Sequence, residues 1–253
     1  MEKKKFIDVE FKDKYAIIYY ELVDDLVTKE TLKSLQLGLK QIEHHNHCLA
    51  VIFISKNHNS SIGWSKELIL NNAQGNKLVD QLLNEIASLT MPTIFLLKGK
   101  SYSAGLELSL ACDIRFAAND TQISLLNASN DYIPADSSIN RLSRSMPRHK
   151  VLELLLFHKI ILADEAYSSG LISAVYDNAT AISESIQITK EIASRGPVAI
   201  KVLKQVLTLG SKTDLNTGME IEHEGTIILQ NTDDFIEGTD AFLNKRTPKF
   251  EGK

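Results

Sequence analysis

Short apolar runs alternate with segments of helical periodicity up to about residue 180, and this alternation restricts the fold more than any other feature. Residues 49–55 and 91–98 have the length and composition of buried strands. Residues 28–43 and 78–89, which precede these two runs, carry apolar side chains at helical spacing. The pattern predicts parallel βαβ units with right-handed crossovers, and therefore an α/β fold whose loops gather at the carboxyl ends of the strands.

Other segments extend this pattern. Residues 6–11 and 15–20 predict the two strands of an opening hairpin. The polar stretch 57–72 predicts a long loop, and long loops in compact domains often carry function. Later in the chain, the sequence predicts strands at 121–126 and 171–175, mostly helical structure from residue 139, and a short helix from residue 163.

The last part of the chain has a different composition. Three amphipathic segments, 182–194, 197–209 and 214–231, follow one another with no strand between them. This change predicts an α/β core over residues 1–180 and a helical region over residues 181–253. Because amphipathic helices need an apolar surface to cover, we expect the second region to take part in oligomerisation.

Composition excludes several classes of protein. The 253 residues carry a net charge of −4, and the basic residues are scattered apart from Lys3–Lys5, so no nucleic-acid-binding surface is expected. Cys48 and Cys112 lie in apolar stretches without metal-ligand spacing, which favours free thiols and a cytoplasmic protein. No apolar run approaches the ~20 residues that cross a bilayer, so we expect no membrane insertion.

Residues 99–116, GKSYSAGLELSLACDIRF, join a turn of small residues to an apolar helix. The first amides of that helix, at Ala104 and Gly105, have no partner within the helix, and the helix dipole adds positive potential there. The segment could therefore hold an oxyanion, with Glu107 beside it. Alternatively, Gly105 lets the helix pack closely on its strand, and Glu107 only favours the helix electrostatically.

The order of these elements resembles the crotonase superfamily, the enoyl-CoA hydratase and isomerase family. The resemblance implies a crotonase-like spiral of ββα units with a C-terminal helical region. It rests on residues 99–116 and on four later segments that stand in family order: Ile133-Pro134, Arg141-Leu142, the stretch from Ala163 to Ile172, and the tail Ala241–Phe250.

Members of this family bind acyl-CoA thioesters and hold the thioester oxygen between two backbone amides. Carried onto this chain, the resemblance implies that the amides of Ala104 and Trp64 form this oxyanion hole. Ala104 stands where the family usually has glycine, and Trp64 follows Gly63, an expected substrate contact. The Trp64 side chain is either an ordinary loop anchor or a further substrate contact.

Glu107 falls on the first of the two catalytic glutamates of hydratases, and the second position is occupied by Asn127. An amide can orient water but cannot accept and return a proton, so the single glutamate fits double-bond isomerisation better than hydration. Asp136 and Asp131 are candidate partners of Glu107, as catalytic and substrate-binding residues respectively. Both could equally be solvated loop acids or helix caps.

The remaining implications concern ligands and partners. Gly105 is an expected substrate contact, and Lys245, with Arg246 and Lys249, matches basic residues that approach CoA phosphates, although a solvated terminus is the alternative. The resemblance implies a homotrimer or hexamer and no cofactor or metal other than coenzyme A as part of the substrate. Decarboxylation, a catalytically weakened acyl-CoA or acyl-carrier binder, and a structural subunit of a mixed oligomer are the alternatives.

Overall fold

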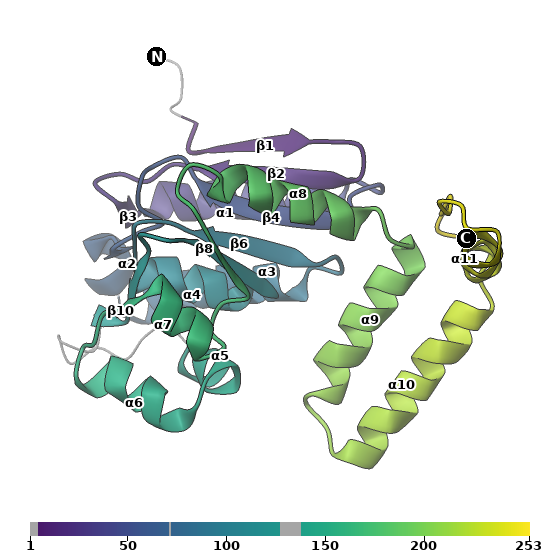
Figure 1. The fold of residues 1–253 in the computed structure, drawn as a ribbon. Helices are drawn as coiled ribbons and strands as arrows, with labels where there is room; N and C mark the ends of the chain where they lie inside the picture. Colours follow the sequence, from purple (N-terminus) through teal and green to yellow (C-terminus); the bar gives the residue numbers. More distant parts are fainter. Residues whose placement is uncertain (1–4, 71, 127–137) are drawn as a thin grey trace.

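A six-stranded sheet forms the centre of the computed structural model, which describes residues 5–70, 72–126 and 138–253 (Figure 1). Its strand order is β1-β2-β4-β6-β8-β11. β1 and β2 form the predicted antiparallel hairpin, and every later pairing in this sheet is parallel. The strands are β1 (Ile7–Phe11), β2 (Tyr15–Tyr20), β4 (Ala50–Ser55), β6 (Thr93–Leu97), β8 (Ile114–Ala118) and β11 (Ala174–Tyr176).

Two small sheets form a second layer. β3 (Leu26–Val27) pairs with β5 (Gly63–Trp64), and β7 (Lys100–Tyr102) lies beside β9 (Gln122–Ser124), which also pairs with β10 (Ile161–Leu162). Each short strand β3, β5, β7 and β9 follows one strand of the large sheet along the chain. The predicted spiral of ββα units is therefore confirmed.

Helices cover both faces of the large sheet, which explains why its central strands are almost entirely apolar. On one face, Val51 and Phe53 of β4 pack in a cluster with residues of α1 (Lys29–Glu43), α3 (Asn72–Ser88) and α4 (Ala104–Ala111). On the other face, the alternate residues Ile52 and Ile54 pack with α8 (Ala181–Ala193). α8 thus lies on the sheet, and the division of the chain near residue 180 stays a prediction.

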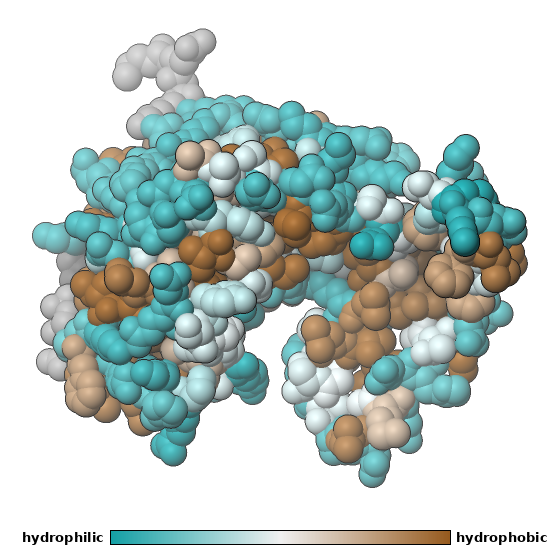
Figure 2. Space-filling view, viewed as in Figure 1, coloured by the Kyte–Doolittle hydropathy of each residue, from teal (hydrophilic) through white to brown (hydrophobic). Residues whose placement is uncertain are grey.

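Three further helices extend from this core: α9 (Pro197–Gly210), α10 (Leu215–Gln230) and α11 (Asp233–Leu243) (Figure 1). α9 packs on α10, and Figure 2 shows hydrophobic residues gathered on the faces that these helices present. Large apolar side chains remain exposed there, including Leu203, Leu207, Leu215, Ile228 and Phe242. Within the described residues, this surface lacks the apolar partner that amphipathic helices need.

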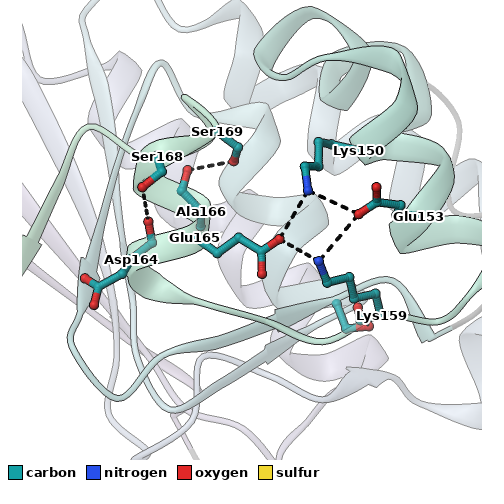
Figure 3. A network of polar contacts seen from close by, with 9 residues as sticks. Lys150, Glu153, Lys159, Asp164, Glu165, Ala166, Ser168 and Ser169 are labelled. Atoms are coloured by element: carbon teal, nitrogen blue, oxygen red, sulfur yellow. Dashed lines mark hydrogen bonds and ion pairs between the residues drawn. The ribbon is translucent and has the colours of Figure 1, made fainter.

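Four smaller helices complete the described chain: α2 (Lys66–Leu70), α5 (Ser138–Ser145), α6 (Arg148–Leu156) and α7 (Ala163–Ser168). A ring of alternating charges joins the last two (Figure 3). Lys150 Nζ lies 3.3 Å from Glu153 and 3.6 Å from Glu165, while Lys159 Nζ lies 3.4 Å and 2.6 Å from the same two carboxylates. Their hydrogen bonds to the lysines hold the pKa of both carboxyl groups below the ordinary range.

Some predicted elements differ from the structure. The predicted loop 57–72 is wrong in part, because it contains β5 and α2. The strand predicted at 171–175 begins only at Ala174 in β11, since Leu171 and Ile172 donate their N–H groups to the carbonyl oxygen of Ala166 at the end of α7. The turn predicted between β6 and the Glu107 helix includes β7, and neither β8 nor α11 was predicted.

Candidate active site

The start of α4 presents backbone donors, as the sequence predicts. The first hydrogen bond of the helix runs from Glu107 N to Ser103 O at 2.8 Å. Within the described part of the chain, no acceptor receives the N–H groups of Ala104 or Gly105. Because all of α4 is buried, these two donors lie in a water-poor environment at the positive end of a helix.

The backbone around α4 is fixed from two directions. Tyr102 N donates to Ser61 O at 2.8 Å, and Ser103 N donates to Ser124 O at 2.9 Å. Ser103 has φ 41° and ψ −104°, an unusual conformation for a residue with a side chain, and its buried hydroxyl has no partner among the described residues. The sharp turn at Ser103 redirects the chain from β7 into the helix.

The second expected donor lies on β5, whose neighbour is β3. Trp64 stands opposite Val27 in this parallel pair, and Ser65 N donates to Val27 O at 2.9 Å. The Ser61 hydroxyl supports the turn before β5, because it donates to Asp25 O at 3.1 Å and accepts from Gly63 N at 3.1 Å. These hydrogen bonds order this part of the polar segment 57–72, which the sequence predicts as a loop, and so place Trp64 next to α4.

The indole of Trp64 contacts the candidate catalytic carboxylate directly. Its Nε1–H donates to Glu107 Oε2 at 3.2 Å. The Trp64 side chain belongs to the main core, with 3% of the residue exposed, and Glu107 is fully buried. The sequence left Trp64 as an anchor or a substrate contact, and this side-chain partnership was missed because 43 residues separate the two positions.

The two glycines of the predicted site differ in their surroundings. A Cβ on Gly105 would lie 3.0 Å from Ser61 O, so the absence of a side chain there lets α4 pack closely on the segment before β5, and not on its own strand as the alternative interpretation expects. A Cβ on Gly63 would meet Leu26 Cδ2 at 3.7 Å, which is ordinary contact. The packing of the described residues therefore does not require glycine at position 63.

Of the other predicted site residues, Asn127, Asp131 and Asp136 lie outside the described residues. Lys245 is exposed after α11, which Figure 1 shows at the opposite side of the molecule from α4. Arg246 next to it is engaged in a bidentate ion pair with Glu237 at 2.6 Å for each bond, and in a third bond to Asp240 at 2.7 Å.

Among residues 5–70, 72–126 and 138–253, no group of three or more His, Cys, Asp or Glu side chains could hold a metal ion. No helix there is both long and apolar enough to span a bilayer.

Comparison with known proteins identifies the family. A model of the enoyl-CoA hydratase/isomerase family matches residues 24–253. Methylglutaconyl-CoA hydratase of mouse mitochondria is 34% identical over 69% of this chain, and probable enoyl-CoA hydratase 2 of Arabidopsis thaliana is 30% identical over 89% of it. The match covers 77% of the Arabidopsis protein but only 57%, 56% and 52% of the mouse, rat and human methylglutaconyl-CoA hydratases.

Solved structures show the same fold. The enoyl-CoA hydratase of Bacillus anthracis superposes with a TM-score of 0.91 and 26% identity, covering 98% of this chain and 100% of that one. Pseudomonas aeruginosa DspI superposes with a TM-score of 0.92 at 22% identity, which supports the fold alone. The resemblance drawn from the sequence is confirmed, and the chain belongs to the enoyl-CoA hydratase/isomerase family.

Proposed function

We propose that this protein is an enzyme that stabilises the enolate of an acyl-CoA thioester at the start of α4. The Ala104 and Trp64 amides would receive the thioester oxygen, and the Glu107 carboxylate would move the proton. One observation carries the proposal: a fully buried carboxylate stands in the first turn of a helix whose first N–H groups have no acceptor among the described residues. A buried titratable group in such surroundings is a candidate functional group.

The electrostatics of the helix start support this chemistry. Negative charge that develops on the thioester oxygen is stabilised by donors that already point at it, since they need no reorganisation during the reaction. A single donor of this kind lowers a barrier by about 3 kcal/mol. The dipole of α4 acts in the same direction.

Double-bond isomerisation is the reaction that the residues support best. Glu107 would take a proton from the carbon next to the carbonyl of a β,γ-unsaturated acyl-CoA, and the electron pair would move onto the thioester oxygen. The same carboxyl group would then return the proton two carbons further along, as the double bond moves into conjugation. Glu107 ends as it began, so no second acid is required, which suits asparagine at position 127.

Deuterium labelling tests this reaction. Purified protein is incubated in deuterated water with β,γ- and α,β-unsaturated acyl-CoA thioesters, and exchange, double-bond migration and hydration are measured separately. We expect exchange and migration in the wild type and their loss in Glu107→Gln. The control Glu222→Gln alters an exposed carboxylate on α10 and should leave both rates unchanged.

The same assay tests the rival reactions. Hydration at the rate of a two-glutamate enzyme would refute the argument from Asn127, although hydratase is the name that several relatives carry. Decarboxylation would appear as loss of carbon dioxide from a thioester that carries a free carboxylate. Both alternatives use the same proposed oxyanion hole.

A binding protein is the second candidate, and the complete burial of Glu107 beneath Trp64 favours it. Such a protein would bind the thioester without the chemistry. Tight binding of acyl-CoA or an acyl-carrier protein, with no exchange of label in any thioester tested, would support this function over catalysis.

The assembly and the Lys245 contact are also proposals. The exposed apolar faces of α9–α11 support assembly of this chain, for which we propose a homotrimer or hexamer. A cytoplasmic location and the lack of a cofactor are proposed from the sequence alone. Because α11, which ends two residues before Lys245, lies away from α4 within one chain, Lys245 would reach CoA phosphates bound by a neighbouring copy. Light scattering tests the assembly, and a raised KM with unchanged kcat in Lys245→Ala would support the phosphate contact.

A further inference from the structure

Trp64 is the only tryptophan of the chain, and the one polar atom of its side chain, Nε1, donates a hydrogen bond to Glu107. An indole N–H can only donate, and the Glu107 oxygen that receives it lies 3.2 Å away in a buried site. A hydrogen bond in such a buried site is stronger than the same bond in water. The contact is therefore more than packing of an aromatic ring.

The pairing joins two separate parts of the fold. Glu107 is held by α4, whereas Trp64 is held by β5 through its pairing with β3. The indole consequently limits rotation of the carboxylate about its side-chain bonds, which the rigid backbone of α4 cannot do alone. Misplacement of a reacting group by about 1 Å can reduce a rate a hundredfold.

We propose that the Trp64 side chain is a positioning residue for Glu107, holding its carboxyl group in one orientation. Its catalytic part rests on the proposed function, whereas the pairing itself does not. Trp64 would then serve the site twice, with its backbone amide on the thioester oxygen and its indole on the base.

Trp64→Phe separates these two roles, because phenylalanine keeps an aromatic ring and the backbone amide but lacks the indole donor. We expect kcat to fall by about tenfold to a hundredfold while KM changes by less than about threefold, since binding of the thioester oxygen is retained. Tyr20→Phe is the matched control. It removes another buried aromatic donor, the bond from Tyr20 Oη to Ser60 O at 2.9 Å, and should leave kcat within about twofold of the wild type.

A spectroscopic measurement tests the pairing without activity. Protein labelled with ¹⁵N-tryptophan gives one indole resonance, which reports on Trp64 alone. We expect a downfield, slowly exchanging N–H in the wild type, an upfield shift in Glu107→Ala, and an intermediate position in Glu107→Gln. Tyr20→Phe should leave the resonance in place.

The outcomes separate the two proposals. A wild type with no activity but a Glu107-dependent indole resonance would refute the proposed enzyme and retain the pairing. Two outcomes in an active wild type would overturn the positioning role. One is an indole resonance that does not shift in Glu107→Ala, and the other is a kcat that does not fall in Trp64→Phe. If Trp64→Phe does not fold, the indole resonances of the wild type and the Glu107 variants show whether Trp64 is paired with Glu107.

Discussion

The carbonyl oxygen of Ser61 lies 3.0 Å from the place where a Cβ atom would stand on Gly105, and the Ser61 nitrogen lies 3.1 Å from it. Both are rigid backbone atoms, so neither can rotate away as the tip of a side chain could. The same Ser61 oxygen accepts the N–H of Tyr102. Close packing of α4 on this segment thus fixes the distance between the candidate oxyanion donors on the two elements.

Gly105→Ala should therefore lower the free energy of unfolding by about 1–3 kcal/mol, the usual cost of overpacking. In an unobstructed helix the same change would add up to about 1 kcal/mol of stability, because alanine is the better helix former. Gly63→Ala is the control, since its Cβ would meet only Leu26 Cδ2 at 3.7 Å. Urea unfolding measures both variants, and equal stability of the two would contradict the close contact.

A second prediction concerns the turn at Ser103. Its positive φ costs a residue with a side chain about 1–3 kcal/mol, and its buried hydroxyl has no partner in the described chain. Ser103→Gly removes both costs, so we expect the thermal midpoint to rise by several degrees, as for roughly 1 kcal/mol or more of added stability.

Ser109→Gly is the matched control in the same helix. The Ser109 hydroxyl donates to Leu106 O at 2.7 Å, and glycine within a helix is unfavourable, so this variant should melt earlier than the wild type. A Ser103→Gly protein that also melts earlier would show that the serine side chain stabilises the turn.

Much of the fold could be predicted because strands that are buried on both faces of the sheet appear in the sequence as short apolar runs. β4 and β6 are buried throughout and apolar except at one end, and α1, α8, α9 and α10 carry helical periodicity with recognisable ends. β8 was not predicted because Arg115 interrupts its apolar run. The structure shows why the charge is tolerated: the guanidinium donates to the carbonyl oxygens of Leu171, Ser109 and Cys112.

The sequence predicted only those parts of the site whose residues lie close together along the chain. The step from a small-residue turn into α4 placed Ala104 and Glu107 together within four residues. The bond between Trp64 and Glu107 depends on tertiary packing between β5 and α4, which local periodicity does not encode. α11 was also missed, although a local cap marks its start, where the Thr232 hydroxyl accepts the N–H of Phe235.

The attachment of α9 to the sheet gives a third prediction. Lys204 Nζ donates to Asp113 Oδ2 at 2.6 Å and to Met91 O at 2.9 Å, with little of the lysine side chain exposed. Lys204→Met should lower the free energy of unfolding by about 1–2 kcal/mol, since charge-assisted bonds at a part-buried site are lost. Hydrogen exchange should also accelerate along α9.

Lys201→Met removes an exposed lysine from the same helix and serves as its control. We expect its stability to stay within about 0.5 kcal/mol of the wild type. If both variants lose the same stability, the bonds of Lys204 to Asp113 and Met91 do not hold α9 in place.

The tail provides a prediction of pH dependence. The bidentate hydrogen bonds from Arg246, aided by the N–H of Lys249 at 2.7 Å, lower the pKa of Glu237 from its ordinary 4.5 to about 2. A carboxyl group with a lowered folded-state pKa stabilises the native protein fully above its unfolded pKa. This contribution is lost as the pH falls from about 4.5 towards about 2, since the unfolded chain takes up the proton first.

Glu237→Gln removes this titration while keeping the size of the side chain. We expect the variant to be less stable than the wild type near neutral pH and the difference to shrink as the pH falls through that window, because the wild type alone loses the Glu237 contribution. Thermal melts at about pH 6 and about pH 3 measure it, with exposed Glu222→Gln as the control. Parallel loss of stability in wild type and Glu237→Gln would mean that the Arg246 pair stays too solvated to anchor the tail on α11.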